Sequence, residues 1–350
     1  MLKDFEVSAA DTAFEADGRE FPIGSWLIKD QAGIKQRLAE AAEEAMVEVY
    51  GLKDMPEVAS HELDLPRVAL YHTWTSTQPD GWVRYSLREA GVPYEYINDD
   101  DLRAGGLNGR FDVILVAHQG GSGNLKTMIQ GRDGSFGPMP YEPTEAYPSH
   151  GVIDASPDIT GGIGFQGLAN LQTYLNDGGM LVLMGSAGKL ATESGLLRNV
   201  GALGNSAVNT PGSAIQTKVV RRDHPLAYGF SDVHHVFRTN GPVYTVSEKY
   251  EHWIVVQYGT KPAPGDQEDE KKPEGAFLQT GFVSGQKALE RKGVVLDVPR
   301  QKGGRVILYS FNPLHRHLNV GDQNYVFNAI LNWNDFPMPV STGHPNLAVD

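Results

Sequence analysis

The sequence predicts an α/β fold built on a doubly wound parallel sheet, and three observations lead to that prediction. Short apolar runs alternate with helical segments from residue 67 to residue 204. The apolar run 180–184 enters a small-residue turn, Gly185-Ser186-Ala187-Gly188. Strand patterns resume after residue 290 and end in a helical segment. Strands that alternate with helices are typical of parallel sheets, because each parallel connection needs a crossover.

The elements follow in order along the chain. Residues 1–66 are expected to form N-terminal strands and a helix, followed by a linker: strand signals break at Asp17-Gly18 and Pro22-Ile23-Gly24, and residues 31–50 have helical apolar spacing. The α/β domain is expected to comprise residues 67–204 plus 290–336. Its strands are predicted at 67–71, 94–97, 111–117, 180–184, 293–298 and 305–311, and its helices at 82–90, 168–176 and 324–333.

Two further segments complete the organisation. Residues 205–289 contain short β-type runs, such as 215–220 and 253–258, and are predicted to form a β-rich antiparallel insertion. Residues 119–164 have neither helical nor strand periodicity, which is typical of long functional or disordered connections. Residues 337–350 are expected to form a loose tail.

Composition excludes several classes of function. The net charge of −13 argues against nucleic acid as a partner. The absence of cysteine excludes disulfides, thiolate zinc sites and a cysteine nucleophile. We expect no membrane segment, because no run approaches the roughly 20 apolar residues that a membrane helix needs, and the first residues lack the apolar core of a signal peptide. We expect no cofactor either.

Candidate site residues follow the ends of the predicted strands. In an open parallel sheet, ligands bind beyond the carboxyl ends of the strands, so these residues are expected to share one rim. They are His72, Thr73 and Trp74 after the first strand, His118, Gln119, Gly120 and Gly121 after the third, Ser186 after the fourth, and Asn312, His315, Arg316 and His317 after the last.

Ser186 has two interpretations. Its hydroxyl is suited to capping the following helix, and we favour that interpretation. Alternatively it acts as a nucleophile with His118 or His315 as its base, with Gly120 and Gly121 or Ala187 supplying backbone N–H donors to an oxyanion. A metal site formed by the 315–317 histidines with His118 or His72 is disfavoured, because no metal-ligand motif supports it and ligands that alternate in an extended segment point apart.

Several segments together resemble a known family. They are Phe21-Pro22-Ile23-Gly24-Ser25-Trp26, Pro66-Arg67-Val68-Ala69-Leu70-Tyr71, Asp80-Gly81-Trp82-Val83-Arg84, Gly161-Gly162-Ile163-Gly164, Gly178-Gly179-Met180-Leu181-Val182, the run 304–313 and Phe327-Asn328-Ala329. Their order and spacing resemble the class I glutamine amidotransferase-like module at the C-terminal end of certain bacterial proteins of the zinc carboxypeptidase (carboxypeptidase A-like) family. The resemblance extends from about residue 14 to residue 335 and implies a flavodoxin-like fold.

The resemblance also implies a loss of catalysis. The family's G-x-C-x-G turn is replaced here by Met184-Gly185-Ser186-Ala187-Gly188, and its F-H-P-E element by Phe311-Asn312-Pro313-Leu314. Nucleophile, base and orienting acid are therefore all changed, so we expect a non-catalytic accessory or ligand-binding module.

The resemblance implies partners and a compartment as well. The partners would be an N-terminal peptidase domain of the same parent chain and a small-molecule, glycan or peptide ligand. If that parent is exported, the compartment would be periplasmic or extracellular.

Two other functions are alternatives to the accessory module. One is a serine-dependent hydrolase using Ser186, and the other is a carbohydrate- or peptide-binding module using loop 119–164.

Overall fold

The computed structural model describes residues 5–120, 124–204, 207–261 and 275–337. Its central sheet contains parallel strands in the order β7-β6-β8-β9-β17. Numbered along the chain, this order is 2-1-3-4-5, the flavodoxin-like arrangement. The predicted fold class is therefore confirmed. The strands are β6 (Val68–Tyr71), β7 (Glu95–Ile97), β8 (Val113–Val116), β9 (Met180–Met184) and β17 (Arg305–Tyr309).

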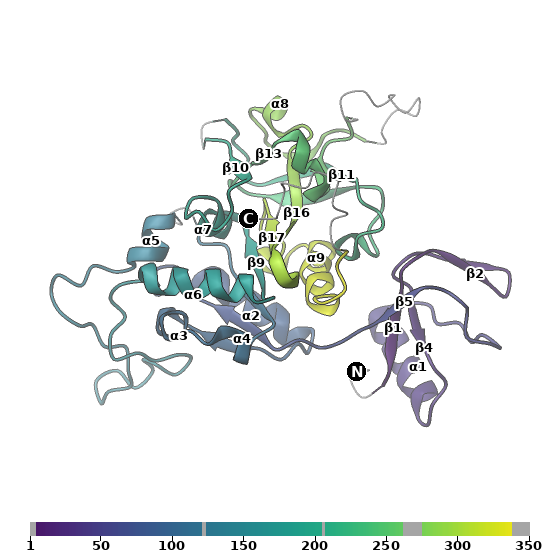
Figure 1. Ribbon diagram of the computed structural model, residues 1–350, viewed down its shortest axis with the longest axis horizontal. Coiled ribbons are helices and arrows are strands. Elements are labelled where there is room, and N and C mark those ends of the chain that lie inside the picture. Colours follow the sequence, from purple (N-terminus) through teal and green to yellow (C-terminus); the bar gives the residue numbers. More distant parts are fainter. Residues whose placement is uncertain (1–4, 121–123, 205–206, 262–274, 338–350) are drawn as a thin grey trace.

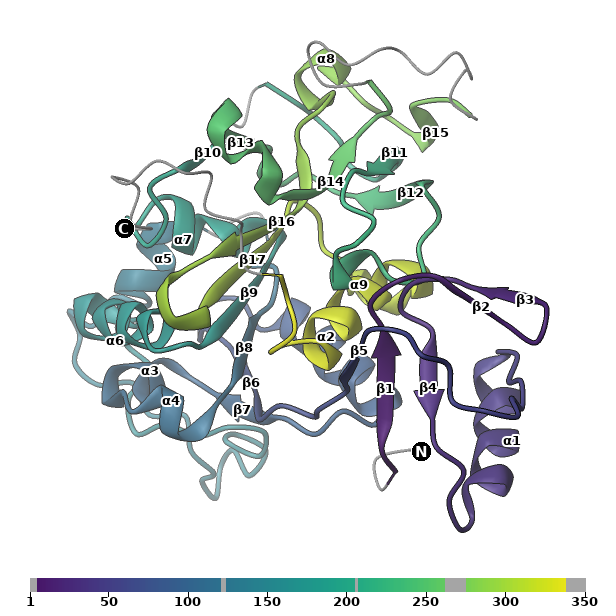
Figure 2. The same cartoon turned by 45° about the vertical axis from the view of Figure 1, so that its right-hand side comes forward.

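Helices cover both faces of this sheet, as Figure 2 shows. One face packs against α2 (Gln78–Glu89) and α9 (Val320–Leu331). The other packs against α3 (Asp99–Ala104), α4 (Leu107–Arg110), α5 (Leu125–Gln130), α6 (Gly164–Asn176) and α7 (Lys189–Thr192). Alternate strand residues serve the two layers: Leu181 and Leu183 face one, Val182 and Met184 the other. Burial on both faces explains the continuous apolar runs in the sequence.

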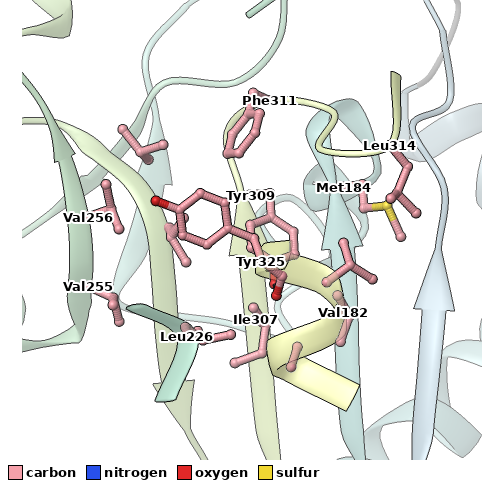
Figure 3. Packing of buried hydrophobic residues seen from close by; sticks show 14 of the residues in the cluster. Val182, Met184, Leu226, Val255, Val256, Ile307, Tyr309, Phe311, Leu314 and Tyr325 are labelled. Carbon is pink, nitrogen blue, oxygen red and sulfur yellow. The ribbon is translucent and has the colours of Figure 1, made fainter. Parts of the chain in front are cut away.

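A buried tyrosine is central to the packing under α9. The ring of Tyr325 lies between β17 and the strands of the 205–289 segment (Figure 3), stacked on Phe230 at 3.9 Å. The Tyr309 hydroxyl donates to the Tyr325 carbonyl at 2.7 Å, and His234 Nε2 lies 2.6 Å from the Tyr325 hydroxyl. The insertion and the α/β domain therefore share one hydrophobic core.

The 205–289 segment contains β-strands, as expected from its sequence, and they extend the central sheet. Strand β16, which was predicted as a strand of the α/β domain, lies beside β17 (Figure 1) and pairs with it antiparallel. From β16 the sheet continues through β14, β11 and β12 (Figure 2). Short strands β10, β13 and β15 pair at its margin. The bounds are β10 (Val200–Ala202), β11 (Ser213–Val219), β12 (Val233–Arg238), β13 (Tyr244–Val246), β14 (Ile254–Tyr258), β15 (Leu278–Gly281), α8 (Gln286–Leu289) and β16 (Gly293–Pro299).

The N-terminal segment forms a small unit beside α9 (Figure 2). Its sheet has the order β4-β1-β5, and a β2-β3 hairpin turns at Asp17-Gly18, where both residues have positive φ. His61 joins the unit to the main body, because its Nε2 lies 2.8 Å from Asn332 Oδ1. The elements are β1 (Val7–Ala10), β2 (Phe14–Ala16), β3 (Arg19–Phe21), β4 (Trp26–Ile28), α1 (Ile34–Ala45) and β5 (Ser60–Glu62).

The tract 119–164 was expected to lack regular structure, and that expectation is wrong in part. Helix α5 lies within it, and α6 begins at Gly164. Asn124 caps α5 in a reciprocal capping box with Thr127, but six residues are too few to show helical periodicity. Helices α3 and α4 escaped prediction for the same reason. None of the described helices combines the length and apolar character needed to cross a bilayer.

Candidate functional site

The turn after β9 depends on two glycines. Gly185 has φ of +53°, and a Cβ atom there would lie 2.4 Å from Nδ1 of His118. A Cβ atom at Gly188 would lie 1.8 Å from the hydroxyl of Tyr244. Only glycine fits at either position. The left-handed residue at the strand-to-helix junction is therefore Gly185, and Ser186 is not among the residues with positive φ. In a hydrolase elbow the nucleophile itself occupies the strained turn.

Ser186 does not cap the following helix, so the favoured interpretation was wrong. Neither the 3₁₀ turn η1 (Gly185–Gly188) nor α7 has a side-chain cap. The Ser186 hydroxyl instead accepts the backbone N–H of Gln119 at 3.0 Å and lies 3.3 Å from His118 Nδ1 and 3.4 Å from the Gly120 carbonyl. The hydroxyl finds this partner because the loop after β8, about 67 residues earlier in the chain, lies beside the turn after β9. Ser186 therefore links the ends of β8 and β9.

The protonation of His118 follows from its contacts. Burial lowers the pKa of His118 to about 4, with a further contribution from His315, so the ring is neutral near pH 7. Its Nδ1 accepts the backbone N–H of Ser186 at 3.1 Å, which assigns the remaining ring hydrogen to Nε2. Among the described residues, no carboxylate forms an ion pair or hydrogen bond with His118. The pair lacks the acid that orients the base in a hydrolytic triad.

The residues after β6 form the other half of the rim. Thr73 donates its hydroxyl to Gln119 Oε1 at 2.9 Å, which connects this half to the Ser186 turn. His72 is buried, its Nε2 lies 2.6 Å from Asp154 Oδ2, and its ring stacks on Tyr96. Trp74 packs edge-on against His72, with ring centroids 4.8 Å apart. His72 and Trp74 are thus close to the Ser186 turn but held in separate contacts.

The residues after β17 do not converge on Ser186 as a group. Asn312 accepts the backbone N–H of Leu314, and His315 packs beside Phe237 while remaining close enough to influence the pKa of His118. Arg316 is exposed, and His317 points toward α2, where its Nδ1 lies 3.0 Å from the Ser86 hydroxyl. Both have positive φ, which turns consecutive side chains apart. Of the two possible bases, only His118 contacts Ser186.

Two candidate features remain, Gly121 and the disfavoured histidine metal site. Gly121 lies outside the described residues. In the part of the chain that the structure describes, no three His, Asp or Glu side chains come together as a metal site.

Sequence reasoning missed the carboxylates behind the rim. Asp154 comes from the long 119–164 tract and accepts hydrogen bonds from both His72 and Asn98. Burial raises the pKa of Asp99 to about 6, although the Tyr71 hydroxyl donates to it at 2.6 Å. Asp80 is fully buried on α2, and burial raises the pKa of its carboxyl well above the ordinary value. For Asp154, the only signal in the sequence was the unusual length of the 119–164 tract, which lets it reach His72 at the end of β6.

Several solved structures of low sequence identity are similar to this chain over about three quarters of its length. No protein-family model and no curated protein matches the sequence. A structure of PurLQS from Thermotoga maritima is similar at 16% identity, with a TM-score of 0.46, over 77% of this chain and 99% of that one. The glutaminase domain of CTPS from Trypanosoma brucei is similar at 11% identity and a TM-score of 0.37, over 78% and 96%. A cytoplasmic protein from Salmonella typhimurium is similar at 12% and 0.39, over 76% and 98%. The fold class of this chain rests on its own strand order.

Proposed function

We propose that this chain is a non-catalytic, amidotransferase-like module that binds a ligand. The observation that carries the proposal is the arrangement of Ser186 and His118. The base nitrogen of His118 already accepts the backbone N–H of Ser186, and no acid among the described residues orients the ring. A nucleophile needs a base that is free to take its proton and a group that holds that base in place.

The competing function is a serine-dependent hydrolase, and one contact favours it. The Ser186 hydroxyl lies 3.3 Å from His118 Nδ1, within reach of a proton transfer that tightens on substrate binding. A pKa of about 4 makes His118 a weak base near neutral pH, because the most effective base has a pKa close to the working pH. The distance between Ser186 and His118 therefore allows proton transfer. The lowered pKa of His118 and the lack of an orienting acid among the described residues oppose catalysis.

We expect a fluorophosphonate probe to leave Ser186 unmodified, because the hydroxyl is not activated. The measurement is intact-protein mass after incubation, followed by peptide mapping of the 180–189 region. The Ser186→Ala variant is the matched control. An adduct on the native chain that disappears in Ser186→Ala would establish an activated serine and overturn the non-catalytic proposal.

We also propose that the module belongs to a larger zinc carboxypeptidase-like protein, with an upstream peptidase domain as its partner. The support is the resemblance of the ordered segments described above. The mass of the native polypeptide, identified through the tryptic peptide 68–84, tests it. We expect a species at least twice the 38.2 kDa of this chain. A native species of that smaller mass would refute the assignment of a parent protein without affecting the ligand-binding proposal.

A further inference from the structure

A groove lies beside the rim, where the topology of the sheet favours ligands. It has a volume of about 540 Å³ and is lined by residues 126, 130–134 and 160–161. Lys126 belongs to α5, which follows β8, and Arg132 reaches back to the loop after β6, donating from Nε and Nη2 to the Trp74 carbonyl. The connections after β6 and β8 leave toward opposite faces of the sheet. Such a switch point is where open α/β sheets bind ligands.

Close backbone packing forms the wall of the groove. Gly131 has φ of +60°, and a Cβ atom there would lie 1.6 Å from the Gly161 carbonyl oxygen. A Cβ atom at Gly162 would lie 2.4 Å from the Met128 carbonyl oxygen. The Gly161 N–H donates to the Arg132 carbonyl at 2.8 Å and fastens the two segments together. Because only glycine permits this approach, the groove is built by the fold and does not result from a loose surface loop.

The cations in the groove lack acidic partners. Across the described residues, neither Lys126 nor Arg132 forms an ion pair, and Lys126 makes no hydrogen bond through its ammonium group. Arg132 Nη1 also has no hydrogen-bond partner there, since only Nε and Nη2 bind the Trp74 carbonyl. Two cationic groups that have no acidic partner among the described residues, in one groove, favour an anionic occupant.

The groove also contains one ionised carboxylate, that of Asp133, so its charged side chains retain an excess of positive charge. Asp133 accepts the backbone N–H of Ser135 at 2.9 Å and also its hydroxyl, and these hydrogen bonds lower the pKa of Asp133. Thr160 donates its hydroxyl to Asp158 at 2.7 Å. Among the described residues that line the groove, the ammonium of Lys126 and Nη1 of Arg132 are therefore positively charged donors without a hydrogen-bond partner.

We propose that this groove binds the carboxylate or phosphate group of a small anionic ligand, with Lys126 and Arg132 as its charged donors. The inference rests on the ligand-binding function proposed above and names the chemical class of the ligand. Arg132 presents a planar donor group whose orientation is fixed by the Trp74 carbonyl, while Lys126 supplies a mobile point charge. The site lies apart from the Ser186 hydroxyl, so binding here requires no chemistry at Ser186.

Titration of the full chain with inorganic phosphate and, separately, with succinate tests the site. Calorimetry and the melting temperature are measured at low and constant ionic strength, because screening weakens exposed charge pairs. We expect at least one anion to bind the native chain, and Lys126→Gln to weaken it about tenfold, the size expected for one charge-assisted hydrogen bond. Lys53→Gln, which removes an exposed lysine on the N-terminal unit, is expected to bind like the native chain.

Arg132→Lys separates charge from geometry, and its folding is checked by the melting temperature without ligand. Weakened binding in both groove variants, with Lys53→Gln unchanged, supports the site, and the preferred anion identifies phosphate or carboxylate as the group. Equal shifts in all variants would indicate general anion effects and overturn the proposal. The proposal would also be overturned if neither phosphate nor succinate bound the native chain. Neither result bears on labelling of Ser186, so failure of this site is distinguishable from failure of the non-catalytic proposal.

Discussion

Replacing Arg238 with methionine is expected to lower the free energy of unfolding by about 4 kcal/mol. The Arg238 side chain is 1% exposed and donates to the Pro242 carbonyl at 3.1 Å, the Tyr258 hydroxyl at 2.9 Å and the Gly241 carbonyl at 2.8 Å, and also to the Ser310 carbonyl. Methionine fills part of the volume but donates nothing, so these buried acceptors lose their partner. Each such loss costs about 1–3 kcal/mol, and relaxation recovers part of the total.

Urea unfolding monitored by tryptophan fluorescence measures this change. Arg88→Met is the matched control, because the Arg88 side chain is 71% exposed and its pair with Glu89 is a surface contact. We expect the control to lie within about 0.5 kcal/mol of the native chain. A similar small effect in Arg238→Met would show that the four acceptors find water instead, and that Arg238 does not fasten the 238–242 turn to the end of β17.

Replacing Arg305 with methionine is expected to cost a comparable 3–5 kcal/mol, the usual effect of removing one partner from a buried ion pair. Arg305 Nη1 donates to Asp297 Oδ2 at 2.5 Å, and both side chains are at most 4% exposed. His224 Nε2 lies 3.0 Å from the same oxygen. Arg305 Nη2 also binds the Phe336 carbonyl at 2.7 Å and so secures the segment after α9. Loss of the guanidinium leaves a buried carboxylate without its main counter-charge.

A double variant and a pH series identify the cause of that destabilisation. Burial by itself raises the pKa of Asp297, but hydrogen bonds from His224 and the charge of Arg305 reverse this and hold it below the ordinary value. In the native chain, Asp297 therefore contributes stability above about pH 4 that is lost as the pH falls through its lowered pKa. Without Arg305, burial favours the protonated carboxyl, so the deficit of Arg305→Met should shrink from pH 8 to pH 5.

The Asp297→Asn, Arg305→Met pair removes both charges and is expected to recover at least half of the loss. A deficit that is independent of pH, with no recovery in the double variant, would assign the effect to the lost Phe336 contact in place of the ion pair.

The sequence by itself determined the fold class. Apolar runs such as 180–184 are buried on both faces of the sheet, and that environment imposes a pattern that can be recognised without knowing the neighbours. It also placed the turn at Gly185-Ser186 and the rim residues at strand ends, since the direction of a parallel strand fixes which end its following loop occupies. The short helices α3 and α5 were not predicted, because each spans less than two turns and shows no helical periodicity.

Tertiary structure alone decided what the rim residues contact. Ser186 was predicted to cap its own helix, but its partners are Gln119 and His118, about 67 residues earlier in the chain. Likewise Asp154 reaches His72 across 82 residues. Local propensity reports on neighbours within one helical turn, whereas hydrogen-bond partners depend on which loops the sheet brings together. Chain order thus specified the sheet and the edge at which the candidate residues lie, and long-range packing specified their protonation, their partners and the groove beside them.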